Sequence, residues 1–148
     1  MGKRFEIEER VRWSDVDRAG IIYFGSYVRF FEIAETELFR AMGFPFSIAN
    51  EILDIYLVRR QFHVDFHSPA YLDDLATVEL WVTHIGNTSL RLDFEMERSE
   101  SAHGKTGDRL VTGHCVLVSV DREHYRPVPL PDILKTAMNE YLAAEKSS

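Results

Sequence analysis

Apolar and polar residues alternate in two segments of the chain, residues 4–13 and 55–67, which is the pattern of strands that bury one face. Residues 75–85 and 88–98 are expected to form a hairpin, because Gly86 and Asn87 between them are a turn signal. Residues 109–120 are a long apolar segment typical of a buried strand. Consecutive strands joined by short turns indicate an antiparallel sheet.

Two other segments have the spacing of helices. Between residues 26 and 42 the apolar side chains recur every three or four positions: Tyr27, Phe30, Phe31, Ala34, Leu38, Ala41 and Met42. Ser26 suits the N-cap of this helix, and Gly43 suits its C-terminal stop. A second helix is predicted from Asp132 onward. The wide apolar stripe of the first helix must be covered, so we expect an α+β domain whose sheet curls around one central helix.

The length of 148 residues predicts a single domain over residues 1–148. A net charge of −7 argues against a nucleic-acid-binding surface. The single cysteine permits no intramolecular disulfide. Neither a signal peptide nor an apolar run of about 20 residues is visible. The expected compartment is therefore the cytoplasm, with no membrane span.

The chemistry of the chain is concentrated just ahead of the first helix. Asp15 and Asp17 stand one residue apart where a strand ends, and Gly20 follows. A carboxylate ahead of a helix N-terminus can attack an acyl group or activate water, while backbone N–H groups receive the developing negative charge. The arrangement suits hydrolysis of an activated acyl group, although the same two aspartates could simply form a turn with side-chain hydrogen bonds.

The segment 15–24 resembles the Asp-x-Asp-x-x-Gly-x-x-Tyr signature of the hotdog-fold acyl-CoA thioesterases, in the 4-hydroxybenzoyl-CoA thioesterase-like family. Three further blocks resemble the same family in the same order: residues 66–75, 85–91 and 126–131. The resemblance implies a hotdog fold, with an antiparallel sheet wrapped around one long central helix and a C-terminal helix. It also implies hydrolysis of an acyl-CoA thioester to a carboxylic acid and CoA.

The resemblance assigns the catalytic carboxylate to Asp17, either as nucleophile or as general base for water. The backbone N–H groups at Phe24 and Gly25 are implied to polarise the thioester carbonyl. No metal or organic cofactor is required, since CoA is part of the substrate. CoA is expected at a subunit interface, so the implied assembly is a homodimer or homotetramer.

The remaining candidate residues are expected to contact the substrate. Asp15 is expected to orient the loop and Gly20 to relieve crowding near the ligand, while Tyr23 and Tyr27 wall the acyl pocket. Basic side chains are candidates for the CoA phosphates: Arg59, Arg60, Arg91 and Arg126. The chain departs from a family branch that carries a basic pair at the hairpin turn, because residues 86–88 are Gly-Asn-Thr here.

Rival interpretations stay open at this stage. Glu32, Glu35 and Glu37 on the central helix could hold the real base, or could form a solvated or interface-facing polar stripe. His63, Asp65 and His67, which alternate along one strand face, could bind a metal, but the same pattern is typical of a solvated or interfacial strand face. His114 and Cys115 are expected to be packing residues. The alternative functions are an acyl-thioester hydratase or dehydratase on the same fold, and a non-catalytic acyl-CoA-binding protein.

Overall fold

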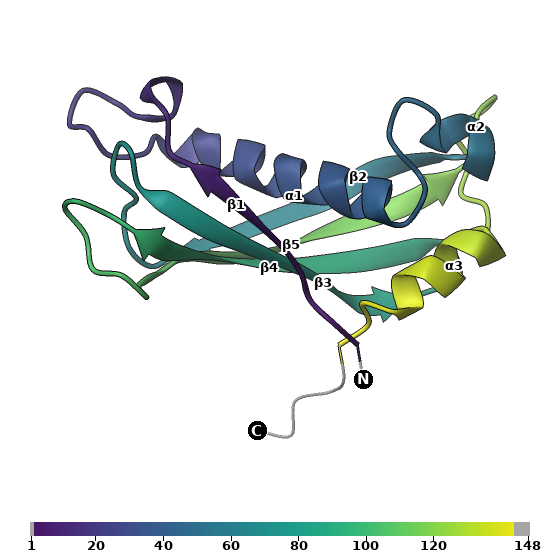
Figure 1. Cartoon of the computed structure of the whole chain (residues 1–148). Coiled ribbons are helices and arrows are strands. Elements are labelled where there is room, and N and C mark those ends of the chain that lie inside the picture. The colour runs from purple at the N-terminus through teal and green to yellow at the C-terminus, as the bar shows by residue number, and fades with distance from the viewer. Residues whose placement is uncertain (1, 144–148) are drawn as a thin grey trace.

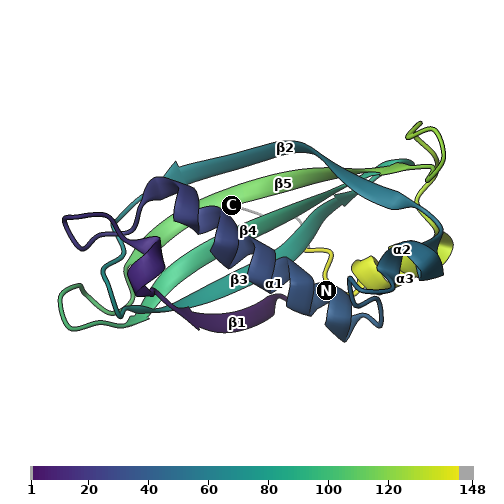
Figure 2. The same cartoon turned by 90° about the horizontal axis from the view of Figure 1, so that it is seen from above.

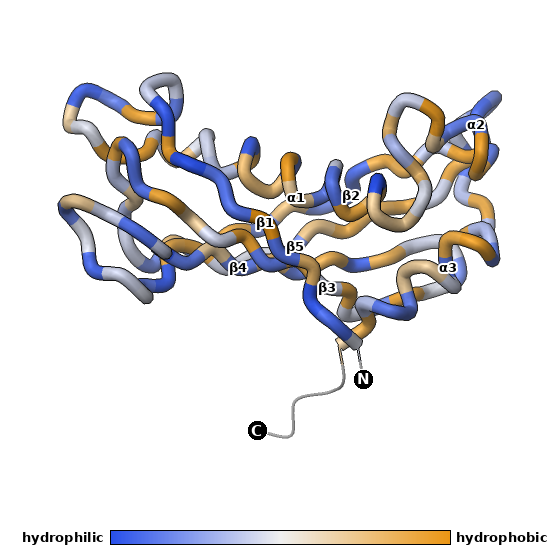
Figure 3. Tube along the Cα trace, in the orientation of Figure 1, coloured by the Kyte–Doolittle hydropathy of each residue, from blue (hydrophilic) through white to orange (hydrophobic). Residues whose placement is uncertain are grey.

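The computed structural model describes residues 2–143 and contains one five-stranded antiparallel sheet (Figure 1). Its strand order is β1-β3-β4-β5-β2. The strands are β1 (Phe5–Arg10), β2 (Tyr56–Phe66), β3 (Leu75–Ile85), β4 (Ser89–Glu100) and β5 (Arg109–Val120). The predicted strands and the predicted hairpin are confirmed. Along β3 and β4, buried apolar residues alternate with less buried ones, and the colour of the tube changes repeatedly along the strands in Figure 3.

The central helix α1 (Tyr27–Ala41) lies across one face of the sheet (Figure 2). Phe30, Phe31 and Leu38 on its inner face are at most 1% exposed. The ring of Phe31 packs against Phe62 of β2 and Phe94 of β4, with centroids 5.3 and 4.9 Å away. The α+β arrangement of a sheet around one central helix is therefore confirmed.

The remaining helices are short and lie at the ends of the sheet. They are α2 (Ala49–Leu53) and α3 (Asp132–Asn139), with the 3-10 turns η1 (Trp13–Asp15) and η2 (Phe24–Ser26). The C-terminal helix α3 was predicted, whereas α2 was not. Within residues 2–143, no helix combines the length and apolar character needed to cross a membrane.

The two ends of α1 are set by different means. Ser26 is at the N-cap position as predicted, but its hydroxyl does not cap the helix; it donates to the Asp15 carbonyl oxygen at 3.0 Å. At the other end, Gly43 has a φ of +94°. Its N–H donates to Arg40, and the Phe44 N–H donates to Phe39, which is the Schellman pattern. The predicted stop at Gly43 is confirmed.

The edge strand β2 contains a bulge. Arg59 pairs with Leu117 and Gln61 pairs with Val116, which leaves Arg60 as an extra residue without a partner in β5. Side chains of a regular strand point to alternate faces, so the extra residue resets the alternation. As a result Leu57 and Arg59 before the bulge face the same side of the sheet as Phe62 after it.

A buried ion pair fixes the loops beside the N-terminal end of α1. Arg98 and Asp74, whose side chains are 2% and 0% exposed, lie 3.0 Å apart. Arg98 also donates to Asp108 at 2.8 Å and to the Pro69 carbonyl. Because these acceptors come from two separate loops, the pair holds residues 67–74 and 101–108 together.

Candidate active site

The lead motif forms a tight hairpin loop before α1. Val16 bridges Ile22, and the Asp17 N–H donates to the Ile21 carbonyl at 2.9 Å. Gly20 closes the turn with its N–H on the Asp17 carbonyl and has a φ of +78°, which disfavours other residues. No atom lies within 4 Å of the position that a Cβ would take. The positive φ explains the glycine within the chain, and the expected role of Gly20 near the ligand stays a prediction.

Asp17 is exposed at the start of this turn. Its Oδ1 accepts a hydrogen bond from the Ala19 N–H at 2.8 Å. Such a side-chain contact is what we expected if the two aspartates only form a turn. Asp17 also lines a surface cavity of about 360 Å³ with Trp13 and Leu72. Within residues 2–143, Oδ2 accepts no hydrogen bond, so one carboxylate oxygen of Asp17 has no partner.

Backbone donors are available where α1 begins. The Tyr23 N–H donates to Asp15, and the Ser26 N–H donates to Tyr23. Between them, the N–H groups of Phe24 and Gly25 have no acceptor among the described residues. Free N–H groups at a helix start carry the positive end of the helix dipole and suit a developing oxyanion. A Cβ at Gly25 would lie 2.7 Å from the Tyr23 ring, so glycine keeps this turn compact.

A second pocket, of about 250 Å³, lies next to these donors. Its lining residues come from the start of α1 with the turn before it, and from the end of β2 with the loop after it: Ile22, Phe24, Tyr27, Phe66, His67, Ser68 and Pro69. Tyr27 is only 3% exposed, and its ring lies 5.5 Å from that of Phe66. Burial raises the pKa of Tyr27, so its hydroxyl stays protonated. The ring of Tyr23 is 53% exposed and packs on Phe24 instead.

In the single chain Asp17 and the Phe24 donors therefore line neighbouring pockets. Asp15 and Tyr23 face each other in the hairpin, and Asp17 faces Ile21 one step further along. The structure thus places the predicted carboxylate and the predicted donors on one hairpin, at one end of the molecule. Their joint action on one substrate remains a prediction.

Asp15 has a positional role that the sequence suggested only in outline. It is 2% exposed, and Arg29 of α1 donates to both of its oxygens, at 2.8 and 2.6 Å. The Arg12 N–H donates to Asp15 at 2.8 Å, and Arg29 reaches Glu9 of β1 at 2.6 Å. These acceptors raise the pKa of Arg29. The network ties β1, the motif loop and α1 together, and the sequence analysis missed Arg29.

The four candidate phosphate-binding arginines do not converge. Arg59 pairs with Glu35, and Arg91 pairs with Asp93 at 2.9 Å. Arg60 lies at the bulge of β2 and Arg126 in the loop before α3, both exposed and without an ion pair among the described residues. None of the four lines the pocket at Asp17 or the pocket at Phe24. Their predicted role toward CoA stays a prediction.

The rival carboxylates on α1 differ from one another. Glu35 is 1% exposed, so the expectation of a solvated polar face is wrong at this position. Glu32 is exposed, and Glu37 lies 3.2 Å from Arg40 on the outer side of the helix. Glu35 is buried because Arg59 of β2 supplies a guanidinium beside it.

The histidine-rich face of β2 holds no group of three or more metal ligands among residues 2–143. His63 lies 3.2 Å from Asp65 and stacks on His114, with ring centroids 5.2 Å apart. His67 instead lies 2.8 Å from the Thr112 hydroxyl and borders the pocket at Phe24. Cys115 is buried, and burial raises the pKa of its thiol, in keeping with a packing role.

The α+β fold and the motif at the start of its central helix define a thioesterase-type protein. The model of the thioesterase-like superfamily matches residues 11–138, and the chain belongs to this superfamily. It is 30% identical over 122 residues to the acyl-CoA thioester hydrolase YbgC of Escherichia coli O6:H1, covering 82% of this chain and 86% of that protein. It is 27% identical over 135 residues to the acyl-CoA thioesterase YbgC of Haemophilus influenzae, covering 91% and 94%.

Solved structures support the fold. The 1,4-dihydroxy-2-naphthoyl-CoA thioesterase Slr0204 from Synechocystis superposes with a TM-score of 0.83 at 22% identity, covering 93% of this chain and 97% of that one. SAV2348 from Staphylococcus aureus, solved in complex with CoA, superposes with a TM-score of 0.85 at 16% identity, covering 100% and 91%. The hotdog fold and the resemblance to hotdog-fold thioesterases are confirmed.

Proposed function

We propose that this protein hydrolyses an acyl-CoA thioester to a carboxylic acid and CoA. The observation that carries the proposal is membership of the thioesterase-like superfamily over residues 11–138, with 30% identity to an acyl-CoA thioester hydrolase. The site supports it, because a carboxylate with one unpartnered oxygen and two unpartnered N–H groups lie on one hairpin before α1. Those are the groups that thioester hydrolysis needs.

In the proposed reaction, the thioester oxygen accepts the N–H groups of Phe24 and Gly25. Asp17 then acts in one of two ways. As a nucleophile, its carboxylate attacks the carbonyl carbon, the C–S bond breaks, the CoA thiolate leaves and takes a proton, and water hydrolyses the mixed anhydride. As a general base, it takes a proton from the water that attacks; the C–S bond then breaks, and the protonated Asp17 gives the proton to the departing CoA thiolate. Either route returns Asp17 to its carboxylate form and uses no metal or organic cofactor.

The placement of the substrate follows from the two pockets. The pocket of about 250 Å³ at Phe24, with Tyr27 and Phe66 on its walls, is proposed to take the start of the acyl group. Tyr23, Asp15 and Gly20 shape the loop between the pockets. Arg60 and Arg126 are free for the CoA phosphates, whereas Arg59 and Arg91 would first have to leave Glu35 and Asp93.

The proposed assembly is a homo-oligomer in which the site is completed at a subunit interface. The exposure of Asp17 and of Phe24, which is 66% exposed, supports this, because a second copy would enclose both. We take residues 1–148 as one thioesterase domain that acts in the cytoplasm.

The direct test compares Asp17→Asn with the matched control Asp65→Asn, which neutralises an exposed aspartate on the outer face of β2. Hydrolysis of a panel of aryl and aliphatic acyl-CoA esters is followed by release of the CoA thiol. Asp17→Asn is expected to lower kcat by about 10²–10⁴ and Asp65→Asn to leave it unchanged. A loss below about tenfold in Asp17→Asn would remove Asp17 from the mechanism.

The two roles of Asp17 are separated by mass spectrometry of enzyme quenched with acid during turnover. An acyl adduct on the peptide that contains Asp17 indicates nucleophilic attack. Full activity with no adduct at any quench time indicates a general base.

One observation favours a second function, a hydratase or dehydratase acting on acyl thioesters. His67 borders the same pocket as Phe24, which brings a titratable ring close to the proposed oxyanion donors. Hydration of an enoyl-CoA that depends on His67, with no thiol release, would favour this function. Tight CoA binding with turnover of neither substrate, unchanged in Asp17→Asn, would indicate a non-catalytic acyl-CoA-binding protein.

A further inference from the structure

The segment 69–72 borders both pockets of the candidate site. Pro69 lines the pocket at Phe24, and Leu72 lines the pocket at Asp17. One short piece of backbone therefore supplies a wall to each pocket. The two pockets keep their relative position as long as this segment stays in place.

The same segment pairs with the hairpin that carries the predicted carboxylate. The Ile22 N–H donates to the Ala70 carbonyl at 2.9 Å, and the Leu72 N–H donates to the Gly20 carbonyl at 3.1 Å. On the side of α1, the Ala70 backbone forms a hydrogen bond with the Tyr27 side chain. The segment thus contacts both the hairpin and the first residue of α1, so its position affects how the two are aligned.

A buried ion pair holds both ends of the segment. The Arg98 guanidinium donates to the Pro69 carbonyl, and the Asp74 carboxylate accepts the Tyr71 N–H at 2.9 Å. The side chains of Arg98 and Asp74 lie 3.0 Å apart and are 2% and 0% exposed. Because almost no water reaches either side chain, solvent does not replace a hydrogen bond that one of them loses.

The guanidinium of Arg98 is also enclosed by the loop after β4. It donates to the Lys105 carbonyl at 3.2 Å and to the Asp108 carboxylate at 2.8 Å. A Cβ at Gly104 would overlap the guanidinium, so a glycine lets the loop close over it. The loop and β4 together fix the place from which Arg98 reaches Pro69.

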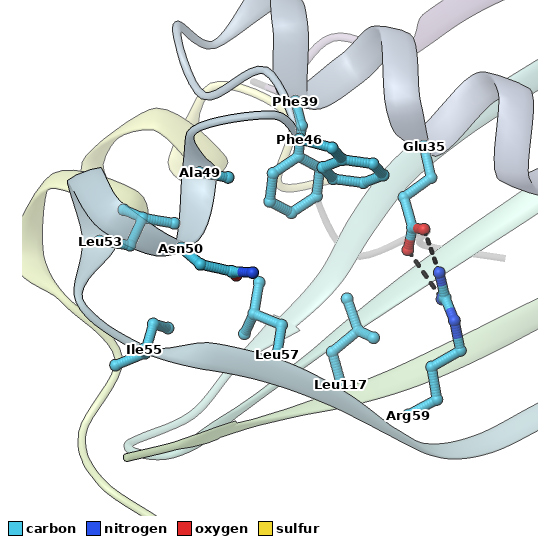
Figure 4. A pocket seen from close by; sticks show the side chains of 10 residues that line it. All are labelled: Glu35, Phe39, Phe46, Ala49, Asn50, Leu53, Ile55, Leu57, Arg59 and Leu117. Carbon is cyan, nitrogen blue, oxygen red and sulfur yellow. Dashed lines mark hydrogen bonds and ion pairs between the residues drawn. The ribbon is translucent and has the colours of Figure 1, made fainter. Parts of the chain in front are cut away.

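The pair of Glu35 and Arg59 lies further along α1 and differs in solvent exposure. Arg59 is 46% exposed at the edge of a pocket between α1, α2 and β2 (Figure 4). Water can therefore solvate the Arg59 guanidinium when its contacts change. The Arg98 guanidinium has protein groups around it instead, so its removal leaves the Pro69 carbonyl without a donor.

Stability alone does not explain a buried pair of this kind. Apolar residues of similar volume often replace a buried ion pair at no cost in stability. The planar fork of arginine instead holds several acceptors at fixed angles. At Arg98 these acceptors include the carboxylates of Asp74 and Asp108 and the Pro69 carbonyl at the wall of the Phe24 pocket.

We propose that Arg98, paired with Asp74, is a positioning residue of the candidate active site. It holds the segment 69–72 against the hairpin and thereby keeps Asp17 aligned with the free N–H groups before α1. Arg98 acts through the segment and does not touch the substrate. The proposal rests on the proposed function, because this alignment matters to catalysis when both groups act on one thioester.

The test combines Arg98→Met with Asp74→Asn in the full-length protein. Methionine removes the fork, and asparagine removes the charge that would stay buried alone while keeping an oxygen for the Tyr71 N–H. The double variant is expected to stay folded by circular dichroism and to lose kcat by about 10–100-fold, with KM changed by less than about threefold. The matched control is Arg109→Met with Glu95→Gln, which removes a 2.9 Å ion pair on the outer face of the sheet and should keep the native kcat.

Arg98→Lys keeps the proposal testable if the double variant does not fold. Lysine retains a positive charge beside Asp74 but lacks the fork, so kcat is expected to fall by about tenfold in a folded protein. A kcat within about twofold of the native value, in Arg98→Lys or in the folded double variant, would overturn the proposal. The same holds if kcat falls in proportion to the unfolded fraction, which is what a purely structural role predicts.

Amide hydrogen exchange separates this proposal from the proposed function. The Ile22 and Leu72 amides pair the segment with the hairpin, and they are expected to exchange about tenfold faster in each folded Arg98 variant than in the native protein and the control. Unchanged exchange at both amides would contradict the positioning role. A native protein that hydrolyses no acyl-CoA would refute the proposed function, and the exchange rates would still decide whether Arg98 holds the segment.

Discussion

Arg29 places a positive charge in the first turn of α1, where the helix dipole disfavours a cation. The charge is accommodated because the buried Asp15 accepts two of its hydrogen bonds and Glu9 a third. A basic residue at this unfavourable position, 14 residues after the first aspartate of the motif, is the sequence signal that would have predicted the pair. Asp15 therefore holds in place the loop that carries Asp17.

Arg29→Met is expected to lower the free energy of unfolding by about 3 kcal/mol, because the Asp15 carboxylate stays buried and loses its partner. The matched control is Arg40→Met on the same helix, which breaks an exposed pair with Glu37 and should cost at most about 1 kcal/mol. Urea denaturation of both variants measures the difference. Equal losses in the two would show that the buried network contributes nothing beyond a surface ion pair.

His114 is expected to make the stability of the protein depend on pH. Burial and, next, the charge of Arg91 lower the pKa of His114 below its ordinary value of 6.5. The unfolded chain therefore binds a proton at His114 more readily than the folded chain, so His114 contributes stability above about pH 6.5 that is lost as the pH falls. Urea denaturation at pH 7.5 and pH 5.0 should show a smaller loss in His114→Gln than in the native protein. An identical loss in both would contradict this assignment.

At the residue scale, the sequence predicted which residues of the candidate site stand before α1. It did not predict which side chains pack beside the site or pair with Glu35. The positions of Asp15, Asp17, Phe24 and Gly25 relative to α1 follow from local spacing, so they could be predicted. The burial of Glu35 could not, because it depends on a partner 24 residues away and on the register of β2. The place of His67 beside Phe24 likewise depends on how the loop after β2 folds back.

At the scale of elements, the ends of α1 show what local chemistry decides. Gly43→Ala is expected to destabilise the protein by roughly 1–2 kcal/mol, because alanine is strained at a φ of +94°. Gly43→Asn should cost less, since asparagine tolerates this conformation better. Thermal and urea unfolding of the two variants provide the comparison. An alanine variant as stable as the native protein would mean that the helix end relaxes to another conformation.

The long elements were predicted almost to the residue, whereas the shortest of the α-helices, α2, was missed. The predicted helix 26–42 and strand 109–120 agree with Tyr27–Ala41 and Arg109–Val120. Such segments contain several periods of the apolar pattern, which fixes their type. The five residues of α2 do not complete two helical turns, so they carry no readable period. Because α2 was not predicted, Phe39 was left out of the predicted buried stripe of α1. In the structure Phe39 is 1% exposed and packs on Phe46.

At the scale of the whole molecule, β2 is a long edge strand with a free side. It pairs only with β5 among residues 2–143, so its outer backbone groups are unpaired. An edge of this length invites pairing with another chain. Exposed apolar side chains lie along it and near it: Phe24, Val28, Val58 and Phe66. This edge is where we expect the homo-oligomer to form.

Val58→Lys on β2 is expected to shift the protein toward monomer, because a charge would have to be buried in the interface. Ile133→Lys on α3 is the control, since Ile133 is also an exposed apolar residue but lies away from β2. Light scattering after size-exclusion chromatography measures both masses. A monomeric native protein, or a dimer that survives Val58→Lys but not Ile133→Lys, would place the interface elsewhere or remove it.

The unpaired Arg60 in β2 has a further consequence for how this protein can change over time. It joins two stretches of strand whose side-chain alternation is shifted by one residue. Arg59 before it reaches Glu35 of α1, and Phe62 after it packs against Phe31 in the first half of α1. Because each stretch keeps its own inward and outward pattern, substitutions in one leave the orientation of the other intact. Deletion of that one residue would turn one stretch inside out, so the packing on both sides of Arg60 fixes the length of β2 between them.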